Sequence, residues 1–193
     1  MNRFTLMMLL SLAIISINAT ALFITYTNVP NTSEIIIDAD WVNLYPNFKE
    51  LADSSDLIIR GVVLDSISYK LELSEPTSAP LLLTNYTIKI EEIIKGYEDS
   101  EIINVRMTGG RLDGKVISVR GCPLMKKGET VILFLKRFAK DNYYVIGGPQ
   151  GRFIIKGGKV YSLGEIYPSA KKYTSHLKTN GIPIREFIES IEQ

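Results

Sequence analysis

The alternation of apolar and polar residues is clearest in the stretch NYTIKIEEIIKG, residues 85–96. Apolar side chains occupy every second position from Tyr86 to Ile90, and polar side chains lie between them. This period of two is typical of a β-strand with one buried face. Two consecutive glutamates, Glu91 and Glu92, then interrupt the alternation, which predicts a bulge or bend. The other strand-like runs can pair with this strand.

Similar short runs predict further strands in the same module. The run 131–135 is apolar throughout, which is consistent with a strand buried on both faces. Gly61 lies inside another run, and a glycine there indicates a bulge or the tight bend of a barrel corner. The dipeptide Asp113-Gly114 supplies the positive φ of a tight hairpin turn. Strands are expected over residues 35–37, 57–65, 82–94, 101–107, 115–119, 131–135, 143–146, 152–155 and 159–162.

Two segments have the apolar spacing of helices. A short helix is expected over residues 46–53, and an apolar stripe over 183–192 predicts a C-terminal helix that begins at Pro183. Residues 164–179 show no clear period. The expected fold class is all-β, that is, β-rich with two short flanking helices, and the strands favour a closed or nearly closed antiparallel domain.

The amino-terminal residues form an apolar leader. Residues 4–26 carry no charge, and their length exceeds the roughly 20 residues that cross a bilayer. They are either a signal peptide, cleaved after Ala21 at an A-x-A site, or a retained signal anchor. Both alternatives export the chain, as a single-pass membrane protein with its domain outside or as a secreted protein. A polar tether over 27–33 and an extracytoplasmic domain over 34–193 are expected to follow.

Charge is nearly balanced overall but unevenly distributed. The net charge of +1 over 193 residues gives no field that would attract nucleic acid. Residues 34–66 hold seven acids against two bases, whereas residues 151–180 hold six bases against Glu165. These segments are either two solvated faces, or the second is a basic surface for an anionic partner such as lipid headgroups or a wall polymer.

Few residues carry recognisable chemistry. His176 is the single histidine, and its unpatterned polar surroundings favour a surface position. Cys122 is the single cysteine, which excludes an internal disulfide framework and favours an incidental or partly buried thiol. The carboxylates at 38–40 and 97–101 lack EF-hand spacing and favour solvated turns. We assign no catalytic, metal or cofactor residues.

The densest glycine cluster, residues 147–151, predicts a tight corner in a curved sheet. It does not open an amphipathic helix, so it fails the context of a phosphate-binding loop. A candidate binding surface at this corner consists of Tyr143, Gln150 and Arg152. Asn31 and Asn85 begin N-x-S/T sequons and are candidate N-glycosylation sites if the cell glycosylates exported proteins.

Several motifs together resemble a group of uncharacterised exported proteins of bacteria and archaea. Their spacing is also similar to the five-stranded OB barrel of the netrin-like or tissue-inhibitor-of-metalloproteinase type. The resemblance covers residues 46–161. The motifs are SDLIIRG at 55–61, YTI at 86–88, IIKG at 93–96, Gly109-Gly110, Gly128-Glu129 before 131–135, and GPQGRF at 148–153.

The resemblance implies a small OB-like Greek-key barrel with extra hairpin strands, whose loops or open face contact a partner. It does not imply metalloproteinase inhibition. That activity uses a disulfide-fixed amino-terminal cysteine as metal ligand, and Cys122 lies in mid-chain.

The expected role is therefore a non-enzymatic extracytoplasmic module that recognises a protein or an envelope component, without nucleic acid or a small-molecule cofactor. An extracytoplasmic hydrolase that uses carboxylates brought together by folding is the alternative, and a cell-surface structural protein is a third. A cleft lined by carboxylates would favour the enzyme. An exposed apolar or aromatic patch beside the glycine corner would favour binding.

Overall fold

The computed structural model of the chain describes residues 33–38, 41, 43–71 and 81–192. The predicted leader, its cleavage site after Ala21, the sequon at Asn31 and nearly all of the predicted tether lie outside these residues. Among the described residues, no helix is both long enough and apolar enough to cross a bilayer.

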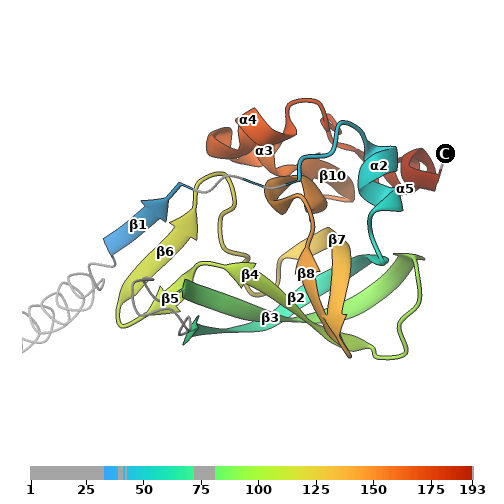
Figure 1. Cartoon of the computed structure of the whole chain (residues 1–193). Coiled ribbons are helices and arrows are strands. Elements are labelled where there is room, and N and C mark those ends of the chain that lie inside the picture. The colour runs from blue at the N-terminus through green and yellow to red at the C-terminus, as the bar shows by residue number, and fades with distance from the viewer. Residues whose placement is uncertain (1–32, 39–40, 42, 72–80, 193) are drawn as a thin grey trace, which may run out of the picture. The chain divides into compact units, whose positions relative to one another are not determined.

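The described part of the chain is β-rich, with one large sheet and a few short helices (Figure 1). The strands of the large sheet are, in spatial order, β11 (Ile182–Pro183), β10 (Lys159–Ser162), β9 (Arg152–Lys156), β7 (Thr130–Ala139), β2 (Leu57–Leu71), β3 (Leu81–Lys95), β4 (Ile102–Thr108) and β8 (Asn142–Val145). A smaller sheet contains β1 (Ser33–Ile37), β6 (Lys115–Val119) and β5 (Gly110–Leu112).

The pairings of the large sheet close on themselves. Strand β7 pairs antiparallel with β2 through its first half and with β8 through its second half. Strand β8 in turn pairs parallel with β4. Hydrogen-bonded neighbours therefore run from β2 through β3, β4, β8 and β7 back to β2, and β9, β10 and β11 extend the sheet from β7. We call β2, β3, β4, β8 and β7 the ring.

Strand β7 is buried on both faces, as its apolar run predicts. Val131, Leu133 and Leu135 pack into one hydrophobic cluster, and Ile132 and Phe134 pack into another. The first cluster, the ring core, receives side chains from all five ring strands. It contains Leu57, Ile59, Val63, Tyr86, Ile88, Ile103, Val105, Met107, Val119, Cys122, Met125, Val131, Leu133, Leu135 and Tyr143. The second cluster lies under helices and contains Leu51, Ala52, Ile58, Ile132, Phe134, Ile146, Phe153, Val160, Leu177 and Phe187.

A bulge interrupts β3 at the predicted position. Ile90 pairs with Gly61, and Glu92 pairs with Arg60, so Glu91 is an extra residue in β3. A side chain at Gly61 would not fit there, because its Cβ would lie 2.6 Å from a carbonyl oxygen of β3. The predicted bulge at the paired glutamates is confirmed, and Gly61, for which a bulge or a tight bend is expected, lies directly beside it.

The helices gather on one side of the sheets (Figure 1). They are α2 (Phe48–Asp53), α3 (Leu163–Ile166), α4 (Lys171–Thr174) and α5 (Ile184–Glu192), with the 3-10 turns η1 (Gly148–Gly151) and η2 (Pro168–Ala170). Helix α2 is capped by Asn47, whose side chain accepts a hydrogen bond from the Glu50 N–H at 2.8 Å. The C-terminal helix begins at Ile184, because Pro183 belongs to β11 instead.

The unpatterned segment 164–179 folds into short helices that hydropathy alone did not predict. They are held by one carboxylate, Glu165, which accepts hydrogen bonds from the N–H groups of Ser162 (2.8 Å), Thr179 (3.1 Å) and Asn180 (2.6 Å). Burial raises the pKa of Glu165, but the hydrogen bonds from Ser162 and Thr179 outweigh burial and lower the pKa overall. The short helices of this segment are thus held by local hydrogen bonds to Glu165, and not by an amphipathic pattern of apolar residues.

Candidate functional site

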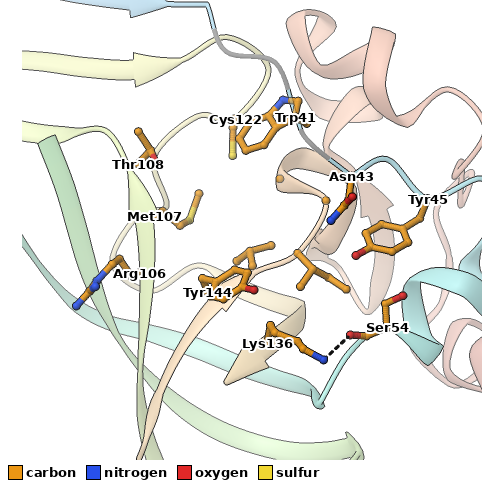
Figure 2. A pocket seen from close by; sticks show the side chains of 14 residues that line it. Trp41, Asn43, Tyr45, Ser54, Arg106, Met107, Thr108, Cys122, Lys136 and Tyr144 are labelled. Carbon is orange, nitrogen blue, oxygen red and sulfur yellow. Dashed lines mark hydrogen bonds between the residues drawn. The ribbon is translucent and has the colours of Figure 1, made fainter. Parts of the chain in front are cut away.

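A cleft of about 570 Å³ opens beside the glycine corner (Figure 2). It lies between the ends of β4 and β8 on one side and the segment that leads into α2 on the other. This volume is in the range of ligand-binding pockets. The described lining residues are Trp41, Asn43, Tyr45, Ser54, Arg106, Met107, Thr108, Cys122, Lys136, Tyr144, Val145, Ile146, Gly147 and Gly148.

The cleft forms where two parallel strands separate. Strands β4 and β8 pair from Asn104 with Asn142 to Arg106 with Tyr144. Strand β4 then continues to Thr108 along β3, whereas β8 ends at Val145 and the chain turns away through Gly147 and η1. A crevice outside the carboxyl ends of parallel strands is a recurrent place for ligands, because the diverging connections leave it unfilled.

Aromatic side chains form the walls of the cleft. Figure 2 shows Trp41, Tyr45 and Tyr144 around the same opening. Trp41 packs so closely on Gly148 that a Cβ there would lie 2.4 Å from the indole ring, which explains the glycine. Trp41 is also the single tryptophan of the chain and packs against the ring core. The walls therefore offer rigid apolar surface to a ligand.

Two cationic side chains, Lys136 and Arg106, line the cleft and differ in whether a described carboxylate pairs with them. Lys136 lies 2.7 Å from a carboxylate oxygen of Asp56, and its hydrogen bond holds the pKa of Asp56 below the ordinary value. Arg106 donates from Nε to the Asn85 amide oxygen at 3.3 Å. In the described part of the chain, no carboxylate forms an ion pair with Arg106. Among the described residues, the charge of Arg106 at the mouth of the cleft therefore has no ion-pair partner.

An aromatic strip continues from the cleft over the outer face of the ring. It consists of Tyr69, Phe138 and Tyr144. Phe138 is 43% exposed and Tyr144 is 45% exposed, and their ring centroids lie 6.4 Å apart. The guanidinium carbon of Arg106 lies 4.5 Å from the Phe138 ring centroid and 6.0 Å from that of Tyr69. Stacking of this kind holds the cation in place beside the cleft.

The three residues expected to form a surface at the glycine corner are all buried. Tyr143, Gln150 and Arg152 each have 0% of their surface exposed. Arg152 donates to Glu129 at 2.8 Å and to the Pro123 carbonyl at 2.5 Å. Arg152 and Glu129 thus form an internal ion pair, and Arg152 adds no charge to the basic surface expected over 151–180. We therefore correct the expectation: the three residues are internal and do not line the cleft, and of the three Gln150 supports a cleft wall from behind.

Gln150 shows how this support works. Its amide nitrogen donates to the Tyr45 carbonyl at 3.0 Å, and its amide oxygen accepts from the Tyr45 N–H at 2.8 Å. His176, which is exposed as expected, places Nε2 at 2.8 Å from the same carbonyl. Gln150 thus fixes the backbone of one cleft wall.

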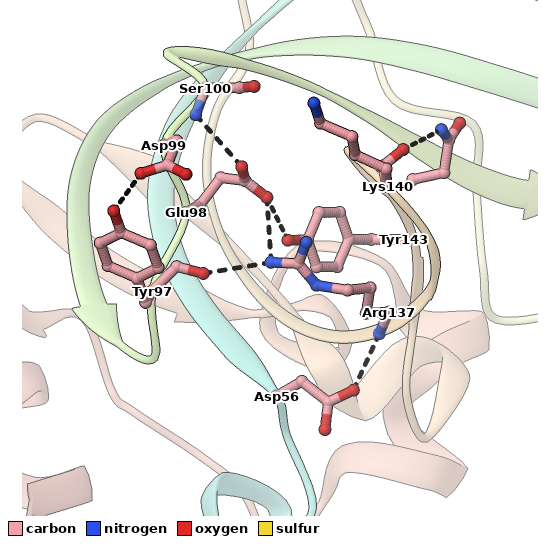
Figure 3. Close-up of polar contacts among 9 residues, drawn as sticks. Asp56, Tyr97, Glu98, Asp99, Ser100, Arg137, Lys140 and Tyr143 are labelled. Carbon is pink, nitrogen blue, oxygen red and sulfur yellow. Dashed lines mark hydrogen bonds and ion pairs between the residues drawn. The ribbon is translucent and has the colours of Figure 1, made fainter.

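Tyr143 belongs to a separate polar cluster, which we call the latch and which comprises Tyr97, Glu98, Arg137 and Tyr143 (Figure 3). The Tyr143 hydroxyl donates to Glu98. Arg137 donates to Glu98 and to the Tyr97 carbonyl, each at 3.1 Å. The latch joins the β3–β4 connection to β7 and β8. Burial raises the pKa of Tyr143, and the hydrogen bond to Glu98 raises it further.

The remaining candidates offer little chemistry. Cys122 is buried, and burial raises the pKa of its thiol to about 11, so it is protonated at neutral pH. Asn85 lies within β3, where its side-chain oxygen accepts from Tyr69 (3.4 Å) and Arg106 (3.3 Å). Asp38 pairs with Arg120 at an exposed position. Among the described residues, no three His, Cys, Asp or Glu side chains gather as a metal site.

The chain matches no model of a known protein family, and no curated protein is significantly similar to it.

The sequence contained weak signals for the cleft. Arg106 lies between the inward-facing residues Val105 and Met107 of an alternating strand, which places its cation on the outer face. Trp41 was noticeable as the single tryptophan. The convergence of these residues with Tyr45 depends on long-range pairing, which no local pattern predicts.

Proposed function

We propose that the chain is a non-enzymatic, extracytoplasmic binding module that recognises a protein or an envelope component through the cleft. The observation that carries the proposal is an open, aromatic-walled cleft with Arg106 at its mouth, a cation that forms no ion pair with the described residues. An exposed aromatic patch beside the glycine corner favours a binding role. Export, with residues 4–26 as a membrane anchor or a cleaved leader, is part of the same proposal.

We also propose that the ring is a five-stranded, OB-like Greek-key barrel related to the netrin-like type. The pairings from β2 through β3, β4, β8 and β7 back to β2 support a closed barrel, as does a ring core to which every one of these strands contributes. In such a barrel the cleft lies at one end, where β4 and β8 part.

The cleft gives less support to the hydrolase alternative. Its described lining contains no Asp, Glu or His, and the thiol of Cys122 is protonated at neutral pH. Acid–base catalysis needs such groups within hydrogen-bond reach of the substrate. The described lining does contain Lys136 and two tyrosines, but Lys136 is paired with Asp56, so the walls are better suited to binding and orienting a ligand than to transferring a proton.

The single tryptophan allows a direct test. Dansyl-glutamate carries an apolar ring system and carboxylates, and its emission is sensitised when it binds close to Trp41. We expect saturable sensitised emission with the full-length protein. The substitution Thr108→Phe, which fills the cleft, should weaken binding at least about tenfold, equivalent to roughly 1.4 kcal/mol.

Asn104→Phe is the matched control. It places the same ring on the same face of β4 but outside the cleft, so binding should remain as in the wild-type protein. Emission that does not saturate, or that both variants reduce equally, would contradict the assignment of the cleft as the binding site.

A further inference from the structure

We infer that the ligand of the cleft is an acidic sugar of the uronate type, a pyranose ring that carries a carboxylate. In this arrangement the ring stacks on the aromatic wall of the cleft, its hydroxyl groups bond to the polar side chains there, and its carboxylate pairs with Arg106. The inference rests on the proposed binding function and specifies the class of ligand.

The strand edges at the cleft decide how a ligand is held. Arg106 of β4 pairs with Asn85 of β3 on one side and with Tyr144 of β8 on the other. Both edges of β4 are therefore occupied at Arg106, and the addition of a strand, a common mode of peptide recognition, is closed there. A ligand beside Arg106 is held by side chains, which favours a compact ring over an extended peptide.

Neutral polar groups lie between the aromatic walls. Figure 2 shows the Asn43 amide and the hydroxyls of Tyr45 and Tyr144 around the opening. Within the described part of the chain, none of these three side chains forms a hydrogen bond. An amide and a hydroxyl each donate and accept hydrogen bonds, as the hydroxyl groups of a sugar do. The polar groups of the cleft therefore match a polyhydroxylated ligand.

The ring of Tyr144 offers a platform beside these groups. Tyr144 is 45% exposed and lines the cleft. A pyranose ring whose hydroxyls are all equatorial has two flat faces of C–H groups, and such groups pack on the electron-rich face of an aromatic ring. A hydrocarbon chain would cover the same surface but would leave the polar groups of the cleft without partners, which costs free energy.

The guanidinium of Arg106 supplies the site for the carboxylate. Its Nε donates to Asn85 at 3.3 Å, whereas its terminal nitrogens form no ion pair with a described carboxylate. The Phe138 ring, 4.5 Å from the guanidinium carbon, holds the group in place. A guanidinium fork pairs with a carboxylate through two parallel hydrogen bonds. Arg106 is the strand partner of Tyr144, so we expect the carboxylate of a ring stacked there beside this fork.

The number of charges favours a single acid over a polyanion. The other cation of the described lining, Lys136, is already paired with Asp56. Single-stranded nucleic acid needs a basic track along its backbone in addition to aromatic platforms. One carboxylate on a ring of hydroxyl groups matches one cation among neutral polar groups.

The test is isothermal titration calorimetry of the full-length protein with two trisaccharides. One is cellotriose, and the other is a trisaccharide of glucuronate with the same rings and linkages. We expect both to bind, with the glucuronate trisaccharide about tenfold tighter because it alone carries carboxylates. Both should also displace dansyl-glutamate from the cleft.

Four variants assign the two contacts. Arg106→Gln should abolish the difference between the trisaccharides, whereas Arg185→Gln should preserve it, because the Arg185 side chain is 92% exposed on α5 and lies outside the cleft. Tyr144→Ala should weaken both trisaccharides about tenfold. Its matched control is Tyr97→Ala, which removes a tyrosine that is 73% exposed outside the described lining and should leave both dissociation constants unchanged.

The outcomes separate the two proposals. Saturable dye binding near Trp41 without binding of either trisaccharide would overturn the sugar inference and leave the binding function intact. Equal dissociation constants for the two trisaccharides would overturn the assignment of an acidic sugar. Binding of oligothymidylate that requires Arg106, without binding of either trisaccharide, would replace the sugar by nucleic acid as ligand. Absence of binding by the dye and by both trisaccharides would remove both proposals.

Discussion

Tyr143 and Tyr144 are neighbours in β8, yet their side chains lie in opposite environments. Tyr143 is fully buried, and its hydroxyl donates to Glu98, which also pairs with Arg137. Tyr144 is 45% exposed and lines the cleft near Arg106, which forms no ion pair with the described residues. Successive side chains of a strand point to opposite faces, so one short strand contributes to both the latch and the cleft.

The difference shows how similar residues serve stability in one place and recognition in another. In the latch each charge meets its partner inside the molecule, and removing one partner leaves the other without compensation. In the cleft no described carboxylate pairs with Arg106, and the aromatic surface is open. We therefore expect latch substitutions to change stability and cleft substitutions to change binding.

The largest expected difference in unfolding free energy is between substitutions of Tyr143 and Tyr144. Tyr143→Ala should lower the free energy of unfolding by roughly 3 to 5 kcal/mol, because it empties a fully buried aromatic site. Tyr144→Ala should lower it by less than about 1 kcal/mol, since nearly half of the side chain is already exposed. Urea unfolding of the full-length protein, followed by circular dichroism, measures both. If Tyr143→Ala does not fold, Tyr143→Phe, which removes only the hydroxyl, should still cost about 1 kcal/mol.

The next largest effect is the contribution of Glu98 to folding stability, which should depend on pH. Burial raises the pKa of Glu98, but hydrogen bonds from Tyr143 and Ser100 and the charge of Arg137 lower it by more. Its folded pKa thus lies below the ordinary value of 4.5, and its contribution to stability is complete above that pH. The contribution is lost as the pH falls through the folded pKa.

Glu98→Gln should therefore lower stability by about 2 kcal/mol at pH 7, and the gap to the wild-type protein should narrow as the solution is acidified below the ordinary pKa. Unfolding measured across this pH range checks the prediction. If the difference in unfolding free energy between the variant and the wild-type protein widens on acidification, the stabilising effect of Glu98 does not come from its ionised carboxylate.

Much of the sheet was predictable because its signals are local. The alternation from Tyr86 to Ile90 specifies one buried face of β3, and the bulge follows where the alternation breaks at Glu91. The hairpin at Asp113-Gly114 forms with positive φ at both residues, as the dipeptide indicates. Each of these features depends on a few consecutive residues.

The site was less predictable because it depends on which distant segments meet. The sequence predicts surface positions for Gln150 and Arg152, but each finds partners far along the chain, the Tyr45 backbone and Glu129 respectively. Polar side chains of this size are usually exposed unless they are paired, and pairing over such separations leaves no local pattern. Arg106 and Trp41 meet at the cleft for the same reason, through tertiary contacts alone.

The smallest expected changes in stability are those of Arg137→Gln and Arg106→Gln, and these two variants should differ in opposite directions in stability and in binding. Arg137→Gln removes the ion pair with Glu98, whose side chain is only 4% exposed, and should cost about 1 to 2 kcal/mol. Arg106→Gln breaks no ion pair with the described residues but removes its stacking on Phe138, and should lower stability by less than about 1 kcal/mol. Binding of dansyl-glutamate should show the reverse order, with Arg106→Gln weakening it and Arg137→Gln leaving it close to wild type. Equal stability losses in the two variants would mean that Arg106 supports the fold as Arg137 does, and the division between a structural latch and a recognition cleft would then fail.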